Sequence, residues 1–179
     1  MKNLVLAITL SRIFLGPIIF LLAVFTQAYF LALLLFFLAA LTDYLDGKLA
    51  RTYQVTSRLG AILDPIADKL LLVFALLSIL LITNDPFVGF MVAIILAREI
   101  WIAGLREYAI EQNNADATAV TFLAKSKTSV QFIAITMYYF SFSTDQAIIT
   151  FLANFVLFLA LLLGLQTATN YTKNVFIKG

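Results

Sequence analysis

Long uncharged stretches alternate with short polar breaks along the chain. They cover residues 13–42, 70–84, 86–97, 128–144 and 146–172. Because about 20 helical residues cross the hydrocarbon core of a bilayer, the first stretch covers most of two spans, with a turn near Thr26. The pattern predicts an all-α polytopic membrane protein, a bundle of six transmembrane helices. They are expected near Leu4–Phe25, Tyr29–Leu49, Leu59–Ile82, Pro86–Tyr108, Val120–Phe142 and Ala147–Thr169.

The composition supports this interpretation. Of 179 residues, 63% are hydrophobic and 12% are charged, whereas soluble proteins have roughly 45–50% and 25%. That excludes a water-soluble domain, and the length leaves no room for a large extramembrane one, so we expect a single membrane domain over residues 1–179. Since Arg12 interrupts the first apolar run and no small-residue cleavage pattern follows, we expect a retained span and not a signal peptide.

The basic residues indicate the orientation of the chain. The turns near Thr26, Asn84 and Thr144 contain none of the 12 Lys and Arg residues. All of these lie on the opposite side: Lys2, Arg12, Lys48, Arg51, Arg58, Lys69, Arg98, Arg106, Lys125, Lys127, Lys173 and Lys178. The positive-inside rule therefore places both termini in the cytoplasm.

Several charges lie too deep to be surface residues. The helix from Leu70 to Asn84 rises about 22 Å, less than the core thickness of about 30 Å, so Asp68 and Lys69 are recessed. By the same measure Arg98 and Glu99 are recessed further. Buried ions cost several kcal/mol and usually face one another or a wet cavity. A single pair could be a salt bridge that joins helices, but this many charges at one depth favour a polar cavity open to the cytoplasm.

Four aspartates form the strongest candidate site. Asp43 and Asp46 are three residues apart, Asp64 and Asp68 are four apart, and each pair shares a helical face. Four recessed carboxylates repel one another unless cations hold them. The chain has no His and no Cys, so these oxygen ligands favour Mg²⁺, Mn²⁺ or Ca²⁺ over Zn²⁺. Two such ions can clamp a phosphoryl group during its transfer.

Small residues accompany the aspartates. Gly47, Ala50 and Gly60 would let a flat ring or a pyrophosphate approach the backbone, and Arg51 could form a forked contact with phosphate. Close helix–helix packing is the alternative explanation for the glycines, because small residues are common at membrane helix contacts.

The full motif is Asp43-x2-Asp46-Gly47-x2-Ala50-Arg51-x8-Gly60-x3-Asp64-x3-Asp68. It resembles the signature of the CDP-alcohol phosphatidyltransferase family. The resemblance implies six transmembrane helices, a homodimer in a bacterial-type cytoplasmic (inner) membrane, and an active site facing the cytoplasm. It also implies two divalent metal ions, Mg²⁺ or Mn²⁺, and CDP-diacylglycerol as the phosphatidyl donor.

The resemblance also implies roles for the motif residues. The metal ligands would be Asp43, Asp46, Asp64 and Asp68. Asp68 would in addition be the general base, which agrees with the absence of His. The CDP group would be held by Gly47, Ala50, Arg51 and Gly60.

The remaining recessed cations suggest the acceptor. The candidates for binding an acceptor phosphate are Arg98, Arg106, Lys125 and Lys127. On a regular helix the two arginines can border one cavity, whereas residues two apart point in nearly opposite directions, so only one of the lysines can face inward. The other lysine would simply be one of the positive charges that cytoplasmic segments of membrane proteins carry. A cationic pocket favours glycerol 3-phosphate or inositol phosphate over a neutral or zwitterionic alcohol.

Further residues favour glycerol 3-phosphate. Arg98-Glu99, Leu105-Arg106-Glu107, Lys125-Ser126-Lys127-Thr128 and Thr9-x2-Arg12 are similar to the pattern in the branch of the family that makes phosphatidylglycerol phosphate in bacteria. Inositol phosphate, serine and phosphatidylglycerol stay open as acceptors. A divalent-cation transporter is a remote alternative, since the outer half of every span is apolar. We expect membrane lipids and the two substrates as partners, and no nucleic acid.

Overall fold

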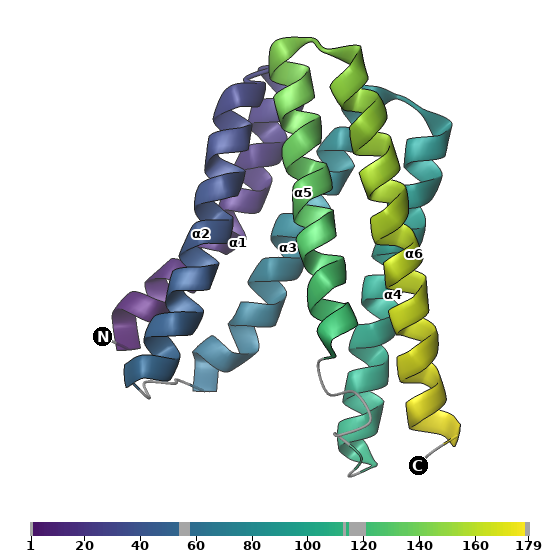
Figure 1. The fold of residues 1–179 in the computed structure, drawn as a ribbon. Helices are drawn as coiled ribbons and strands as arrows, with labels where there is room; N and C mark the ends of the chain where they lie inside the picture. Colours follow the sequence, from purple (N-terminus) through teal and green to yellow (C-terminus); the bar gives the residue numbers. More distant parts are fainter. Residues whose placement is uncertain (1, 54–57, 113, 115–120, 178–179) are drawn as a thin grey trace. The chain divides into compact units, whose positions relative to one another are not determined.

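The computed structural model describes the backbone of residues 2–53, 58–112, 114 and 121–177, and the side chains of residues 9–42, 62–112, 114, 121 and 123–176. The described backbone is helical throughout its regular parts, without a strand (Figure 1). The helices are α1 (Lys2–Phe25), α2 (Tyr29–Tyr53), α3 (Arg58–Thr83), α4 (Pro86–Glu111), α5 (Phe122–Thr144) and α6 (Ala147–Ile177). The predicted all-α class and the order of six helices are confirmed.

The predicted ends were less accurate than the helices themselves. The predicted spans end near Leu49, Tyr108 and Thr169, whereas α2, α4 and α6 continue to Tyr53, Glu111 and Ile177. The prediction followed the apolar stretch, whereas a helix continues as long as its backbone groups pair, also outside hydrocarbon. The predicted start of α5, Val120, lies outside the described residues.

Membrane-spanning character differs among the helices. Within the part of the chain whose side chains are described, α3, α4 and α6 are long and apolar enough to cross a bilayer. Shorter apolar stretches occur in α1, at Thr9–Phe25, and in α2, at Tyr29–Thr42. The remaining helix, α5, contains two lysines and many hydroxyl side chains.

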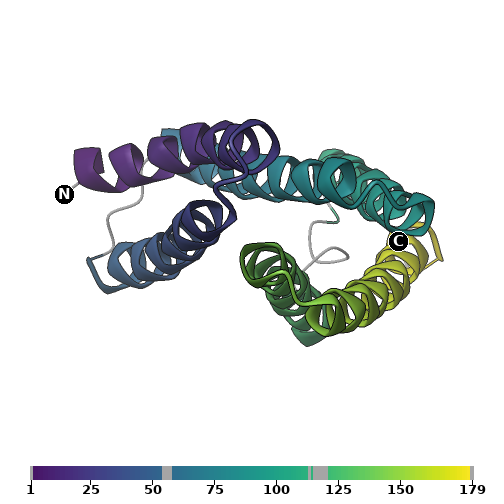
Figure 2. The same cartoon turned by 90° about the horizontal axis from the view of Figure 1, so that it is seen from above.

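The chain divides into two compact units. The first contains α1, α2 and α3 together with residues 138–146 at the end of α5, and the second contains α4, the rest of α5 and α6. Within the first unit α1 packs mainly against α3 and also against α2 (Figure 2). Within the second, α4 packs against α6 through a core of Ile102, Leu105, Ala109, Ala168, Tyr171 and Val175.

Three turns expected from the polar breaks are present, and each contains a residue with positive φ. These residues are Gln27 (53°), Asn84 (47°) and Asp145 (53°). A left-handed residue just past a helix stops it and allows the chain to reverse. After the second turn, the Asp85 carboxylate accepts a hydrogen bond of 2.7 Å from the Phe87 amide and caps α4, with Pro86 in the first helical position.

Gly16 lies where α1 and α3 pack closely against each other. A methyl group at this position would come within 3.2 Å of Phe74 Cδ2, 3.3 Å of the Leu70 carbonyl oxygen and 3.4 Å of Leu71 Cα. Such proximity of one backbone to another is typical of small residues at membrane helix contacts. The contact matters for function because α1 and α3 carry the side chains of the first cluster described below.

We expect Gly16→Ala to destabilise the protein. Overpacking typically costs about 1–3 kcal/mol, which outweighs the gain of about 1 kcal/mol in helix propensity. Gly104→Ala is the matched control, because a methyl group on this exposed glycine of α4 would meet nothing within 4 Å. Thermal unfolding in detergent should show a lower midpoint for the first variant and an equal or higher one for the second. Equal midpoints for both would contradict a tight α1–α3 contact.

Candidate active site

The first cluster joins α1 to α3 through Arg12. Its guanidinium is buried, with a 1% exposed side chain, and donates from Nη1 to Asp68 Oδ1 at 2.8 Å and from Nη2 to Asp64 Oδ1 at 3.2 Å. Thr9, one turn earlier on α1, donates from Oγ1 to Asp64 Oδ1 at 2.7 Å. One buried cation therefore orients both carboxylates of the second predicted pair, which share a helical face as their spacing requires.

The exposure of this cluster is strongly asymmetric. Arg12 is buried, while the side chains of Asp64 and Asp68 are 46% and 51% exposed. In both ion pairs Arg12 contacts Oδ1 of the carboxylate. This arrangement holds two acidic groups in fixed orientation at the edge of the unit, where a ligand can reach them. Pro65 stands between them inside α3 and has no amide hydrogen for the helix ladder.

The described carboxylates fit part of a divalent-metal site. They are oriented oxygen ligands, the kind that Mg²⁺ and Mn²⁺ prefer. Among residues with described side chains, no group of three or more His, Cys, Asp or Glu residues is close enough to hold an ion. Asp64 and Asp68 supply two carboxylate ligands, and the remaining positions around an ion would be filled by other groups such as water or substrate phosphate.

The rest of the predicted motif lies outside the described side chains. Asp43, Asp46, Gly47, Ala50 and Arg51 belong to α2, and Gly60 belongs to α3. Their predicted roles as metal ligands and CDP contacts remain predictions.

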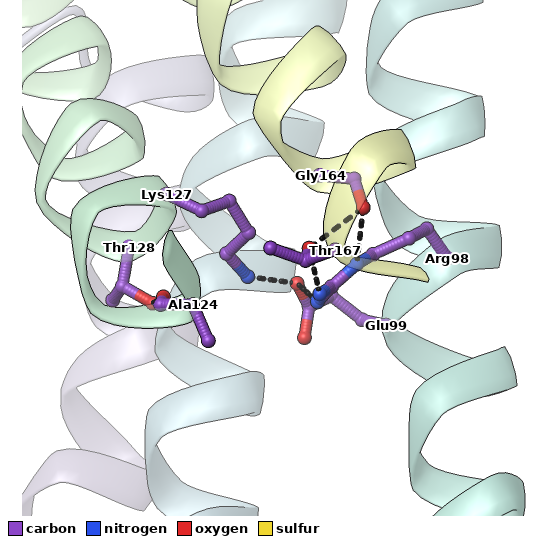
Figure 3. A network of polar contacts seen from close by, with 7 residues as sticks. All are labelled: Arg98, Glu99, Ala124, Lys127, Thr128, Gly164 and Thr167. Atoms are coloured by element: carbon purple, nitrogen blue, oxygen red, sulfur yellow. Dashed lines mark hydrogen bonds and ion pairs between the residues drawn. The ribbon is translucent and has the colours of Figure 1, made fainter. Parts of the chain in front are cut away.

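The second cluster centres on Arg98 of α4 (Figure 3). Arg98 donates from Nε to the Gly164 carbonyl at 3.1 Å and from Nη2 to Thr167 Oγ1 at 2.6 Å, both on α6. Its Nη1 contacts Glu99 Oε1 at 2.9 Å. Thr167 donates its own proton to the Gly164 carbonyl at 2.8 Å, so its oxygen is free to accept from the guanidinium. Arg98 is buried and held on three sides.

Lys127 of α5 enters the same cluster. Its buried ammonium group forms an ion pair with Glu99 Oε1, the oxygen that also contacts Arg98 (Figure 3). Lys125 is exposed. The two lysines therefore point in different directions, as their spacing predicts, and Lys127 is the one that faces inward.

Arg106, two turns after Arg98 on α4, is half-buried. Its Nε is buried and has no hydrogen-bond partner among the described residues. A buried donor without a partner is a group that a bound anion could satisfy. All four predicted acceptor residues lie within the second unit, and two of them, Arg98 and Lys127, are joined through Glu99.

Some site residues were not predicted. The sequence marked Arg12 as a charge in an apolar run, and Thr9 three residues before it, but did not indicate their pairing with Asp64 and Asp68. Nothing in the sequence indicated that α6 contributes hydrogen-bond acceptors to Arg98, because Thr167 is an ordinary hydroxyl in an apolar helix and the Gly164 acceptor is a backbone carbonyl. Both depend on which helices pack together.

The fold and the two clusters define a helical membrane protein with an oriented carboxylate pair and a buried cationic group. Comparison with known sequences identifies the class more narrowly. Residues 2–166 match the sequence profile of the CDP-alcohol phosphatidyltransferases. The chain belongs to this family.

Individual relatives agree with the family assignment. The chain is 38% identical over 136 residues to the CDP-diacylglycerol--glycerol-3-phosphate 3-phosphatidyltransferase of Wigglesworthia glossinidia brevipalpis, covering 74% of each chain. The proteins of the same name from Escherichia coli (strain K12) and Shigella boydii serotype 4 (strain Sb227) show the same identity and coverage.

Proposed function

We propose that this protein transfers the phosphatidyl group of CDP-diacylglycerol to glycerol 3-phosphate, producing phosphatidylglycerol phosphate and CMP. The observation that carries the proposal is the match of residues 2–166 to the family, together with relatives that are named for this reaction. The two clusters support it, since one offers acidic groups for proton removal and the other offers cations for a phosphorylated acceptor.

Asp68 is the general base of the proposed reaction. The acceptor hydroxyl gives its proton to the Asp68 carboxylate, and its oxygen forms a bond to the lipid-side phosphorus of CDP-diacylglycerol. The bond between that phosphorus and the bridging oxygen breaks, and CMP leaves. Arg12 keeps Asp68 in a single orientation through its 2.8 Å contact, which limits the rotation that would misplace the base.

Two divalent ions, Mg²⁺ or Mn²⁺, complete the proposed site. Asp64 and Asp68 would hold them together with Asp43 and Asp46. When bound, such ions neutralise the charge that develops on the transferring phosphoryl group. Gly47, Ala50, Arg51 and Gly60 are the proposed contacts for the CDP group.

The cationic cluster is the proposed acceptor site. Arg98 and Lys127 supply buried positive charge, Arg106 adds the unsatisfied Nε, and Lys125 would lie at its exposed edge. Guanidinium groups recognise phosphate by paired hydrogen bonds. This chemistry favours glycerol 3-phosphate over acceptors that lack a phosphate.

The proposal places a homodimer in the bacterial cytoplasmic (inner) membrane, acting as one catalytic domain over residues 1–179. Both termini and the active site would face the cytoplasm. The distribution of Lys and Arg supports this orientation, because the turns at Gln27, Asn84 and Asp145 contain neither residue.

An acceptor panel tests the substrate. Purified protein is given CDP-diacylglycerol, Mg²⁺ or Mn²⁺, and in turn glycerol 3-phosphate, inositol phosphate, serine or phosphatidylglycerol, while CMP release is measured. We expect the highest kcat/KM with glycerol 3-phosphate. Release of CMP with another acceptor and not with glycerol 3-phosphate would reject glycerol 3-phosphate as the substrate. It would still support phosphatidyl transfer from CDP-diacylglycerol.

The two lysines of α5 provide a matched pair for the acceptor site. Lys127→Gln should raise the KM for glycerol 3-phosphate by about tenfold or more, because it removes a buried charge-assisted contact. Lys125→Gln should change this KM by less than about threefold, because an exposed charge contributes little. Steady-state kinetics at saturating CDP-diacylglycerol measures both. A larger effect at Lys125 than at Lys127 would show that the buried lysine is not the main contact of the acceptor phosphate.

A further inference from the structure

Glu99 lies between the two inner cations of the second cluster and has no role in the proposed reaction so far. Its Oε1 contacts Arg98 Nη1 at 2.9 Å and also the Lys127 ammonium group (Figure 3). The Glu99 side chain is only 15% exposed. A carboxylate in this position meets any phosphate that approaches the same cations.

The two cations are held in different ways. Arg98 has three acceptors, the Glu99 carboxylate, the Gly164 carbonyl and the Thr167 hydroxyl, contributed by two helices. Among the described residues, Lys127 has only Glu99 as a polar partner of its ammonium group. Arg98 therefore stays fixed if Glu99 changes partners, whereas Lys127 can move to another anion.

The effect of the Glu99 charge reverses when an acceptor binds: it is favourable without the acceptor and unfavourable beside it. Before binding, Glu99 lowers the cost of burying Arg98 and Lys127. A phosphate monoester brings a charge of about −1.5 to −2 at neutral pH. Close to this dianion, the Glu99 carboxylate repels it and competes with it for Lys127.

We propose that Glu99 is the resident counter-ion of the acceptor site, a positioning residue that holds Lys127 in place before binding and releases it to the acceptor phosphate. This inference rests on the proposed function, because it requires a phosphorylated acceptor at Arg98 and Lys127. It predicts that Glu99 weakens acceptor binding while it stabilises the protein. If Glu99 were only part of a structural salt bridge, it would stabilise the protein without weakening acceptor binding.

Glu99→Gln separates the two roles, because glutamine keeps the length of the side chain and an acceptor oxygen but removes the charge. Binding of glycerol 3-phosphate, and of inorganic phosphate as a second probe, is measured on the purified protein in detergent. We expect about tenfold tighter binding of both, a lower thermal unfolding midpoint without ligand, and an unchanged KM for CDP-diacylglycerol. Unchanged or weaker binding would overturn the counter-ion role.

Two further variants serve as controls. Glu99→Asp keeps the charge and should bind glycerol 3-phosphate within about threefold of the wild type. Glu107→Gln makes the same chemical change at an exposed position two turns along α4 and should alter neither binding nor the unfolding midpoint. Tighter binding in Glu107→Gln would attribute the effect to net charge and would reject a specific role of Glu99.

The test remains decisive if Glu99→Gln alone does not fold. Removing both members of a buried ion pair costs less than removing one, so Lys127→Gln is compared with the double variant Glu99→Gln/Lys127→Gln. We expect tighter glycerol 3-phosphate binding in the double variant, and equal or weaker binding would overturn the inference. If the wild type binds glycerol 3-phosphate but Glu99 has no effect, only this inference fails. No binding by the wild type would reject the acceptor assignment itself.

Discussion

Asp68→Asn should reduce phosphatidyl transfer by at least about 100-fold, the lower end of what a general base contributes. An amide cannot take the proton of the acceptor hydroxyl. Its carbonyl oxygen can still accept the hydrogen bond from Arg12 that Asp68 Oδ1 now accepts at 2.8 Å, so the orientation of the side chain is kept. We therefore expect CDP-diacylglycerol binding to be largely retained, with the loss in kcat.

Asp145→Asn is the matched control for this variant. It makes the same substitution at an exposed turn residue with a φ of 53°, a conformation that asparagine tolerates well. CMP release at saturating substrates compares the two variants. Near-normal turnover of Asp68→Asn would show that another group removes the proton.

Arg98→Ala should raise the KM for glycerol 3-phosphate by at least about 30-fold, since truncating a buried charged partner costs about 2–5 kcal/mol. The substitution removes the only described cation that contacts both α4 and α6 partners. Thr167 and Gly164 keep their mutual hydrogen bond of 2.8 Å, but the guanidinium that tied them to Glu99 is lost. We also expect a lower thermal unfolding midpoint.

The KM for CDP-diacylglycerol is the internal control in the same experiment. It should change little in Arg98→Ala, because the proposed CDP contacts are other residues. Lys173→Ala, which removes an exposed cation from α6, should leave both KM values near those of the wild type. If Arg98→Ala affected only CDP-diacylglycerol binding, the assignment of the cationic cluster to the acceptor would be wrong.

Helical periodicity explains what could be predicted of the two clusters. Residues three or four apart share a helical face, so the pairing of Asp64 with Asp68 followed from their spacing. The opposite directions of Lys125 and Lys127 followed from the same geometry. The rise of the helix predicted that Arg98 is recessed, because few apolar residues separate it from the turn at Asn84, and the structure shows that its side chain is buried.

Packing between helices explains what could not be predicted. Arg12 contacts Asp64 and Asp68 because Gly16 allows α1 to approach α3 closely, and a pattern within one helix carries no information about its partner. Arg98 is held by Thr167 and a backbone carbonyl of α6 for the same reason. Two of the predicted cations, Arg98 and Lys127, are not isolated charges, because both contact the Glu99 carboxylate.

The formation of product by the purified protein tests the central claim most directly. CDP-diacylglycerol and glycerol 3-phosphate are supplied with Mg²⁺ or Mn²⁺, and CMP and the lipid product are quantified together. The account predicts that CMP and phosphatidylglycerol phosphate form in equal amounts and that neither forms without glycerol 3-phosphate. Failure to produce phosphatidylglycerol phosphate, or CMP release that is independent of glycerol 3-phosphate, would contradict it.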